Sequence, residues 1–237
     1  MTRLGLLYPG YAAEDDLPWL VEALFPDATV VADVVHTTME QDAHDVEVLR
    51  DVGSARNLNE GADVAMWACT SGSFVFGLKG AQRQVAELEE HFGGPASSTS
   101  LGFVSALRAL GLRRVAIAAT YPEPVTSCLV GLLDDAGFDV RGVSSEGIFT
   151  AAEVGTLDED ALLAFVKAGD REDAEVVLVP DTALHTTRSL QALEAAVGKP
   201  VLTANQVSVW EALRLTGHDI PSRAGFGTLF AGVEARR

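Results

Sequence analysis

The feature that most constrains the fold of this 237-residue chain is an alternation of strand-like and helix-like segments that runs twice. Short apolar runs rich in β-branched residues predict strands, and longer segments with a helical apolar period predict helices. Such alternation is typical of parallel βαβ units and therefore of the α/β class. Because the pattern restarts after a turn-rich stretch at 91–98, it predicts two pseudo-symmetric lobes, each a parallel sheet flanked by helices.

The predicted strands occupy residues 4–8, 30–35, 63–68, 115–119, 140–143, 176–179 and 201–203. The predicted helices occupy residues 42–59, 80–91, 100–110, 122–136, 156–167, 187–197 and 206–215. Thr156 and Glu159 have the spacing of a capping box at the start of one of these helices. We assign residues 1–95 plus about 205–237 to the first lobe and 96–204 to the second, because the last helix is expected to cross back.

The net charge of the chain makes two classes of binding partner unfavourable. A formal net charge of −17 argues against nucleic acid and anionic membranes, which basic residues must neutralise. The first apolar stretch ends at Pro9 and is too short for a signal segment, and no run approaches the roughly 20 apolar residues that span a bilayer. We therefore expect a soluble, cytoplasmic protein.

Two segments about a hundred residues apart carry the chemistry that we expect. Each is an apolar run that ends in one reactive side chain, Cys69 or Asp181, followed by small or hydroxylated residues. Ligands of open parallel sheets bind beyond the carboxyl ends of the strands, where both side chains fall. We expect the thiol of one lobe to face the carboxylate of the other, with free backbone N–H groups available for an anion.

Both reactive residues have a simpler alternative interpretation. A thiol at the start of a helix has its thiolate favoured by the helix dipole, but Cys69 could also be a small apolar plug. Asp181 could serve as the N-cap of a following helix. His185, four residues later, could reach the cleft or orient Asp181, or it could be a helix-start histidine bonded to a backbone carbonyl.

Other polar residues at strand ends have similar alternatives. Tyr8 and Tyr11 could line the cleft or pack between the lobes, and Tyr121 could line the cleft. Thr120 and Asn205 could line the cleft or cap helices. Cys128 lies in a helical pattern that predicts a packed core thiol, whereas His36 and His44 are predicted to be surface or capping residues.

Several familiar sites are missing from the sequence. It contains no dinucleotide-binding or P-loop glycine motif after a strand and no serine-hydrolase elbow around Ser71 or Ser73. The five histidines are scattered, and the two cysteines form neither a metal motif nor a disulfide framework. These absences argue against a dinucleotide or P-loop nucleotide site, an ordinary serine hydrolase and a metal centre.

Three segments resemble the maleate isomerase and arylmalonate decarboxylase branch of the aspartate/glutamate racemase superfamily: residues 68–74 (Ala-Cys-Thr-Ser-Gly-Ser-Phe), 119–121 and 200–210. The resemblance covers almost the whole chain and implies a cofactor-free active site between two α/β lobes that often assemble into dimers or higher oligomers. In such families a cysteine from each lobe flanks a small mono- or dicarboxylate. Carried over by position, Cys69 would be catalytic, and the remaining assignments would be carboxylate binding by Thr70, Ser71 and Tyr121 and backbone N–H donation by Thr182 and Ala183.

The chain departs from that family pattern at two positions. Asp181 replaces the second-lobe cysteine, and the asparagine of maleate isomerases is absent after the first strand. We predict a cofactor-independent isomerase or racemase that acts beside a carboxylate through Cys69 as nucleophile or base and Asp181 as acid or base, with Tyr8 and Asn205 as further substrate-binding residues. The alternatives are a decarboxylase of malonate-like acids with Cys69 as proton donor, and a carboxylate-binding protein without catalysis.

Overall fold

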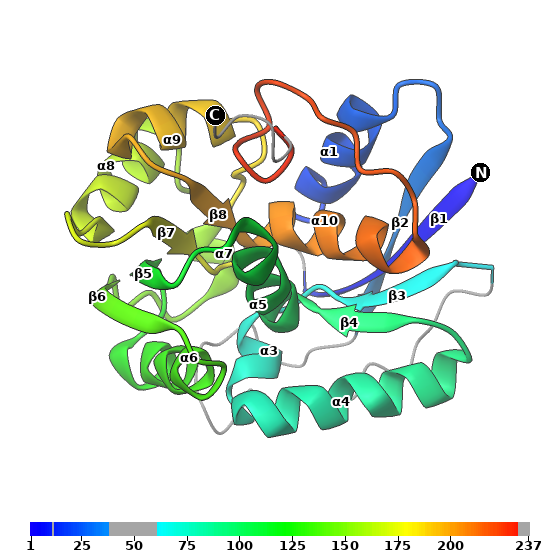
Figure 1. Ribbon diagram of the computed structural model, residues 1–237, viewed down its shortest axis with the longest axis horizontal. Coiled ribbons are helices and arrows are strands. Elements are labelled where there is room, and N and C mark those ends of the chain that lie inside the picture. Colours follow the sequence, from blue (N-terminus) through cyan, green and yellow to red (C-terminus); the bar gives the residue numbers. More distant parts are fainter. Residues whose placement is uncertain (11, 38–60, 232–237) are drawn as a thin grey trace.

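The computed structural model describes residues 1–10, 12–37 and 61–231, which form two four-stranded parallel sheets (Figure 1). The first sheet has the order β2-β1-β3-β4, with β1 at Thr2–Pro9, β2 at Val30–Thr37, β3 at Val64–Trp67 and β4 at Ala96–Ser98. The second has the order β6-β5-β7-β8, with β5 at Arg114–Ala119, β6 at Asp139–Ser145, β7 at Val176–Val179 and β8 at Val201–Thr203. The two orders follow one scheme, so the predicted two-lobe α/β fold is confirmed.

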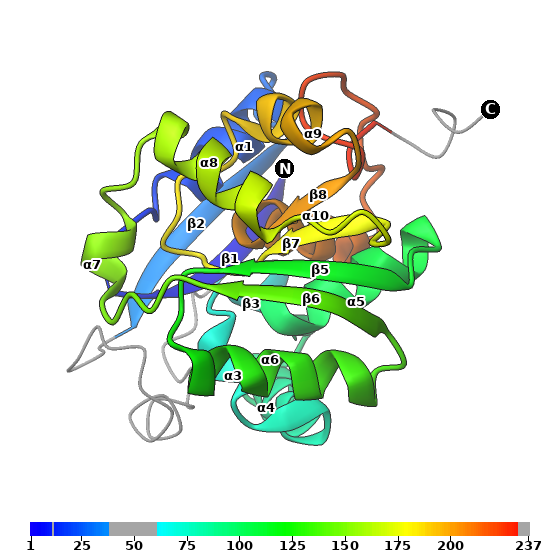
Figure 2. The same cartoon turned by 90° about the vertical axis from the view of Figure 1, so that its left-hand side faces the viewer.

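Helices cover the faces of both sheets. They are α1 (Asp16–Leu24), α3 (Ser71–Phe74), α4 (Gly77–Phe92), α5 (Thr99–Leu110), α6 (Glu123–Asp135), α7 (Ala151–Val154), α8 (Glu159–Gly169), α9 (Leu190–Val197) and α10 (Ala204–Thr216). Figure 2 shows α6 and α8 on opposite faces of the second sheet. Strands β3 and β7 are buried throughout, as expected for strands covered on both faces. Within the described residues, no helix is long and apolar enough to cross a membrane.

The two lobes share one hydrophobic core. A single cluster of buried side chains includes Leu6 and Met66 from the first sheet and Ile117 and Leu178 from the second. Helix α10 contributes to that cluster and packs against α5, α1 and β3, as well as against β8. Helix α10 therefore contacts both lobes, and the carboxyl ends of the two sheets are fixed relative to one another.

Seven of the eight strands match predicted segments. The exception is β4, which lies inside the stretch predicted as a turn-rich boundary and pairs with β3, so the first sheet extends beyond residue 95. Helices α1 and α7 were not predicted, and the helix expected to begin after Cys69 is the four-residue α3. The predicted helix at 42–59 lies outside the described residues.

Two of the predicted helices begin later than expected. Helix α8 is capped by Asp158, whose Oδ1 accepts from the Ala161 N–H at 2.9 Å, rather than by Thr156. The Thr156 hydroxyl donates to the Glu153 carbonyl instead. Helix α9 begins at Leu190 and not at residue 187, which leaves a long irregular segment after β7.

Candidate active site

The candidate site lies where strands of both sheets end. Strand β3 of the first lobe leads into Cys69, and β7 of the second leads into Asp181. The ring of Tyr121, after β5, contacts Phe74 of the first lobe, with centroids 5.5 Å apart. Tyr8, at the end of β1, donates its hydroxyl to the Thr182 carbonyl of the second lobe at 2.9 Å. The carboxyl ends of the two sheets therefore meet.

Cys69 is held by the chain that follows it. The Gly72 N–H donates to Sγ at 3.3 Å, and Ser71 Oγ lies 3.8 Å from the sulfur. A Cβ at position 72 would lie 3.0 Å from that sulfur and 3.1 Å from Trp67 Cζ2, closer than ordinary van der Waals contact, so a side chain here would have to displace the sulfur or the indole by a few tenths of an ångström. The helix expected after Cys69 is the single turn of α3, so local N–H donors, rather than a long helix dipole, face the thiol.

Asp181 is equally buried and is oriented by two donors. Its carboxyl group is 3% exposed, with Oδ2 accepting from the Thr120 hydroxyl and Oδ1 from the Ala183 N–H at 2.9 Å. The next helix begins at Leu190, so the interpretation of Asp181 as a helix N-cap is wrong. Thr120 likewise does not cap α6, whose N-cap is Pro122.

Two buried tyrosines report how the reactive groups are placed. Burial raises the pKa of Tyr8, the hydrogen bond from the Ala13 N–H lowers it, and negative charge on Asp181, Glu14 and Cys69 raises it further. The pKa of the second tyrosine, Tyr121, is also raised. Both phenols therefore stay protonated well above pH 10.

The pKa of Tyr121 is raised by similar causes. Burial raises its pKa first, then negative charge on Asp181 and on Cys69. Hydrogen bonds with the side chains of Thr70 and Ser71 lower the pKa of Tyr121. Since both tyrosines interact with the thiol and with the carboxylate, Cys69 and Asp181 belong to one polar region at the junction of the lobes.

The tyrosine hydroxyls are engaged by backbone carbonyls in this structure. Tyr121 donates to the Pro180 carbonyl at 2.9 Å, as Tyr8 does to that of Thr182. The Ala183 N–H, which was expected to face the substrate, instead donates to Asp181.

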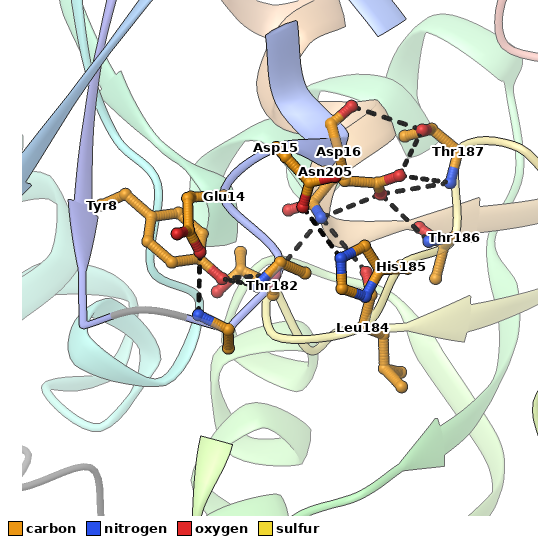
Figure 3. A network of polar contacts seen from close by, with 12 residues as sticks. Tyr8, Glu14, Asp15, Asp16, Thr182, Leu184, His185, Thr186, Thr187 and Asn205 are labelled. Atoms are coloured by element: carbon orange, nitrogen blue, oxygen red, sulfur yellow. Dashed lines mark hydrogen bonds and ion pairs between the residues drawn. The ribbon is translucent and has the colours of Figure 1, made fainter. Parts of the chain in front are cut away.

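Asn205 joins the same segment from α10. Its fully buried Nδ2 lies 3.2 Å from the Thr182 and Leu184 carbonyl oxygens and 3.1 Å from Oδ2 of Asp16 (Figure 3). The carboxylate of Asp16 also accepts from Thr186 and Thr187. Sequence analysis did not identify Asp16, because an aspartate in the first turn of a helix is common and carries no signal of a distant partner.

The histidines do not join the reactive pair. His185 Nε2 lies 2.9 Å from Oδ1 of Asp15 on the protein surface, so the expectation that it orients Asp181 is wrong. His36 is half-buried, with Nδ1 2.8 Å from the Gly10 carbonyl oxygen. Tyr11 and His44 lie outside the described residues.

Two further expectations concern the second cysteine and metal sites. Cys128 is half-buried at the margin of the core, with Sγ 3.4 Å from the Pro124 carbonyl oxygen, and is not the enclosed core thiol that was expected. Among residues 1–10, 12–37 and 61–231, no group of three or more His, Cys, Asp or Glu side chains is arranged to hold a metal ion.

The site can be compared with known proteins. A family model described as arylmalonate decarboxylase matches residues 4–230. The arylmalonate decarboxylase of Bordetella bronchiseptica is 29% identical over 211 residues, which cover 87% of this chain and 88% of that relative. The maleate isomerase of Alcaligenes faecalis is 25% identical over an alignment of 251 residues, which covers 98% and 97% of the two chains.

A solved structure confirms the fold independently. The maleate isomerase Iso of Pseudomonas putida S16, determined with maleate, superposes with a TM-score of 0.85 at 21% identity and covers 98% of each chain. The sequence relatives are decarboxylases and isomerases, so this chain is an enzyme. Because the family model spans nearly its whole length, the chain belongs to the arylmalonate decarboxylase family.

Proposed function

We propose that this enzyme is a cofactor-independent isomerase that acts at the carbon next to a carboxylate of a small mono- or dicarboxylic acid. The observation that carries the proposal is the placement of Cys69 and Asp181. The two groups come from different lobes, and negative charge on each raises the pKa of both Tyr8 and Tyr121. A nucleophile and an acid/base on opposite sides of a substrate are the minimum needed to add to one face of a carbon skeleton and move a proton on the other.

Groups from both lobes bind the substrate carboxylate. The backbone N–H groups of Thr70 and Ser71 and the hydroxyl of Tyr121 bind one substrate carboxylate, after the Tyr121 hydrogen turns away from the Pro180 carbonyl. Since the pKa of Tyr121 is raised, this hydroxyl stays a donor at neutral pH. On the side of Asp181, Tyr8 and Asn205 bind the Thr182 carbonyl. We assign the Thr182 N–H to the developing charge.

An unsaturated dicarboxylate would be isomerised by addition of the thiolate, proton transfer with bond rotation, and elimination of the thiolate. The Cys69 thiolate adds to one olefinic carbon, a C–S bond forms, and the electron pair of the double bond moves onto the neighbouring carbon and its carboxylate as an enediolate. Asp181 donates its proton to that carbon, and the new single bond rotates. Asp181 then removes a proton from the same carbon, the C–S bond breaks, and the thiolate leaves with the double bond in the trans arrangement.

A saturated acid would use the same two groups. Cys69 removes the proton from the carbon next to the carboxylate, and Asp181 delivers a proton to the opposite face, so the configuration inverts. Both versions require that the pair begins with one proton on Asp181 and none on Cys69. The thiolate is favoured by the Gly72 N–H that points at its sulfur.

The test is proton NMR of a panel of small dicarboxylic and α-substituted acids incubated with the enzyme in deuterated water. We expect cis–trans conversion, or deuterium incorporation beside the carboxylate, without release of carbon dioxide. Cys69→Ser should abolish either signal, whereas Cys128→Ser should preserve it. Conversion that persists in Cys69→Ser would rule out the proposed nucleophile.

A second candidate is decarboxylation of a malonate-like acid with Cys69 as the proton donor. It is favoured by the family model and by the 29% identity to an arylmalonate decarboxylase. The same NMR experiment separates the two candidates, because an isomerase conserves every carbon of its substrate. Evolution of carbon dioxide from arylmalonate or methylmalonate would establish the second candidate and overturn the first.

A further inference from the structure

We infer that Asp16 is a positioning residue of this active site, which acts from the first lobe through Asn205 and the Thr182–Ala183 peptide to aim the Asp181 carboxyl group. The inference rests on the acid/base role proposed for Asp181. It concerns a buried carboxylate that the proposed chemistry does not itself use.

Asp16 begins α1 and is 2% exposed. A buried carboxylate is costly unless its oxygens accept hydrogen bonds. Here Oδ2 accepts from the backbone N–H groups of Thr186 at 3.0 Å and Thr187 at 3.1 Å, and Oδ1 accepts from the Thr187 hydroxyl at 2.5 Å. All of these donors belong to the irregular segment between β7 and α9 (Figure 3).

Asp16 also fixes the orientation of the Asn205 side chain. A carboxylate only accepts hydrogen bonds, so the amide must present Nδ2 to it, at 3.1 Å. The same Nδ2 then faces the carbonyl oxygens of Thr182 and Leu184. An amide at position 16 would leave the Thr182 and Leu184 carbonyls as acceptors for Nδ2, but it has one oxygen in place of two, so the hold of residue 16 on Nδ2 would weaken.

The last link is the peptide bond between Thr182 and Ala183. Its six atoms are nearly coplanar, so fixing the carbonyl end fixes the direction of the N–H end. Asn205 and Tyr8 bind the Thr182 carbonyl, and the Ala183 N–H at the other end of the plane donates to Asp181 Oδ1 at 2.9 Å. The orientation of Asp181 therefore depends on a carboxylate that lies 165 positions earlier in the sequence, 181 minus 16.

The chain contains a matched control for a buried carboxylate. Glu211 in α10 is also 2% exposed and accepts from the Ser97 and Ser105 hydroxyls and from Arg214. None of these donors belongs to the segment that follows Asp181. Glu211→Gln therefore measures what the loss of a buried charge costs where that segment is not involved.

The first experiment compares Asp16→Asn with Glu211→Gln on the acid that the NMR panel identifies. A misplacement of a catalytic group by about 1 Å costs on the order of 100-fold, so we expect kcat to fall roughly 10- to 100-fold in Asp16→Asn and less than about twofold in Glu211→Gln. The binding of succinate as a competitor should stay within about twofold in both, because none of the hydrogen bonds described for Asp16, Asn205 or Glu211 involves its docking groups, Thr70, Ser71 and Tyr121. Equal loss of kcat in both variants, or parallel loss of succinate binding, would overturn the inference.

The second experiment asks whether Asp16 acts through Asp181. Residues that act as one unit show non-additive losses, so Asp16→Asn should lower the residual rate of Asp181→Asn by less than about twofold. A full additional loss would show a merely structural role for Asp16 while leaving the role of Asp181 intact. Full activity of Asp181→Asn alone would instead refute the proposed function.

A milder variant covers the case in which Asp16→Asn does not fold. Thr187→Val removes only the hydroxyl that donates to Asp16 Oδ1, while Thr187→Ser keeps it. We expect kcat to fall about three- to tenfold in the valine variant and to recover in the serine variant. Unchanged kcat in Thr187→Val, at normal thermal stability, would count against the inference.

Discussion

The two segments that carry the reactive side chains occupy matching places in the two lobes, yet they are held in different ways. Cys69 lies just before the single turn of α3, whose Gly72 N–H is directed at the sulfur, and helices α4 and α5 bind the carbonyls of that turn: Gln84 donates to Gly72 and Ser100 to Thr70. The segment around Asp181 has no helix until Leu190, and residues from more distant parts of the chain bind its carbonyls: Tyr121 binds Pro180, Tyr8 and Asn205 bind Thr182, and Asn205 binds Leu184. Buried irregular backbone must find such partners. Symmetry of topology therefore does not extend to the support of the site.

The largest expected loss of activity is at Cys69. Cys69→Ser should lower kcat/KM by about 10³-fold or more, because a serine hydroxyl does not ionise near neutral pH as a thiol can. Initial rates measured by NMR would show it. Cys128→Ser, at the margin of the core, should stay within about twofold of wild type. A Cys69→Ser enzyme that keeps a tenth of its activity would show that Cys69 is not the catalytic nucleophile or base.

Asp181→Asn should lower kcat by about 10²- to 10⁴-fold, the usual range for a general acid or base. Because the carbonyls of the Cys69 turn are bound from α4 and α5 and not from the Asp181 segment, the rate of iodoacetamide labelling at Cys69 should change by less than about threefold in this variant. Mass spectrometry of the labelled protein gives that rate. A large change in labelling would show that the two segments are not supported independently.

A smaller effect is expected at Gly72, where an added Cβ would approach both the sulfur and Trp67. Gly72→Ala should destabilise the fold by about 1–3 kcal/mol, the usual cost of overpacking, and lower kcat about tenfold. Gly131→Ala in α6 is the control, because no atom lies within 4 Å of its added Cβ. That variant should be stabilised by roughly 0.5–1 kcal/mol. Urea unfolding measures both, and an unaffected Gly72→Ala enzyme would refute the close packing at the thiol.

The smallest effect concerns the two tyrosines between the segments. Their raised pKa means that above pH 10 the unfolded chain loses phenolic protons that the folded chain keeps, so stability falls as pH rises. The slope should be roughly 1.4 kcal/mol per pH unit for each tyrosine. Urea unfolding between pH 9 and 11.5 should show a shallower decline for Tyr121→Phe than for wild type. Identical slopes would mean that Tyr121 ionises normally in the folded protein.

The sequence was most informative where a pattern is local. Strand β7 falls at residues 176–179 as predicted, because four consecutive apolar residues, three of them β-branched, leave little alternative. Cys69 and Asp181 were identified from their positions at strand ends, and the structure brings both to the junction of the lobes. Strand β4, by contrast, reads Ala-Ser-Ser after a glycine-rich turn and carries no strand signal.

The supports of the site could not be predicted, since they are contacts between distant parts of the chain. Asp16 and Asn205 are 189 positions apart and meet only because α10 returns to the first lobe. Helices α3 and α7 have four residues each, which is too short for an apolar period to appear. The histidine at 185 was misjudged because Asp181 is near in sequence, whereas Asp15 is near in space.

The hydrogen bonds that Tyr8, Asp16 and Asn205 make to the 182–187 segment also limit how members of this family can be recombined. A chimera that takes the first half from one parent and the second from another separates these donors and acceptors from the partners they fit. Its exchanged peptide planes would then be buried without complementary groups. Productive crossover points should therefore inherit positions 8, 16, 182–187 and 205 from a single parent, wherever else the exchange is made.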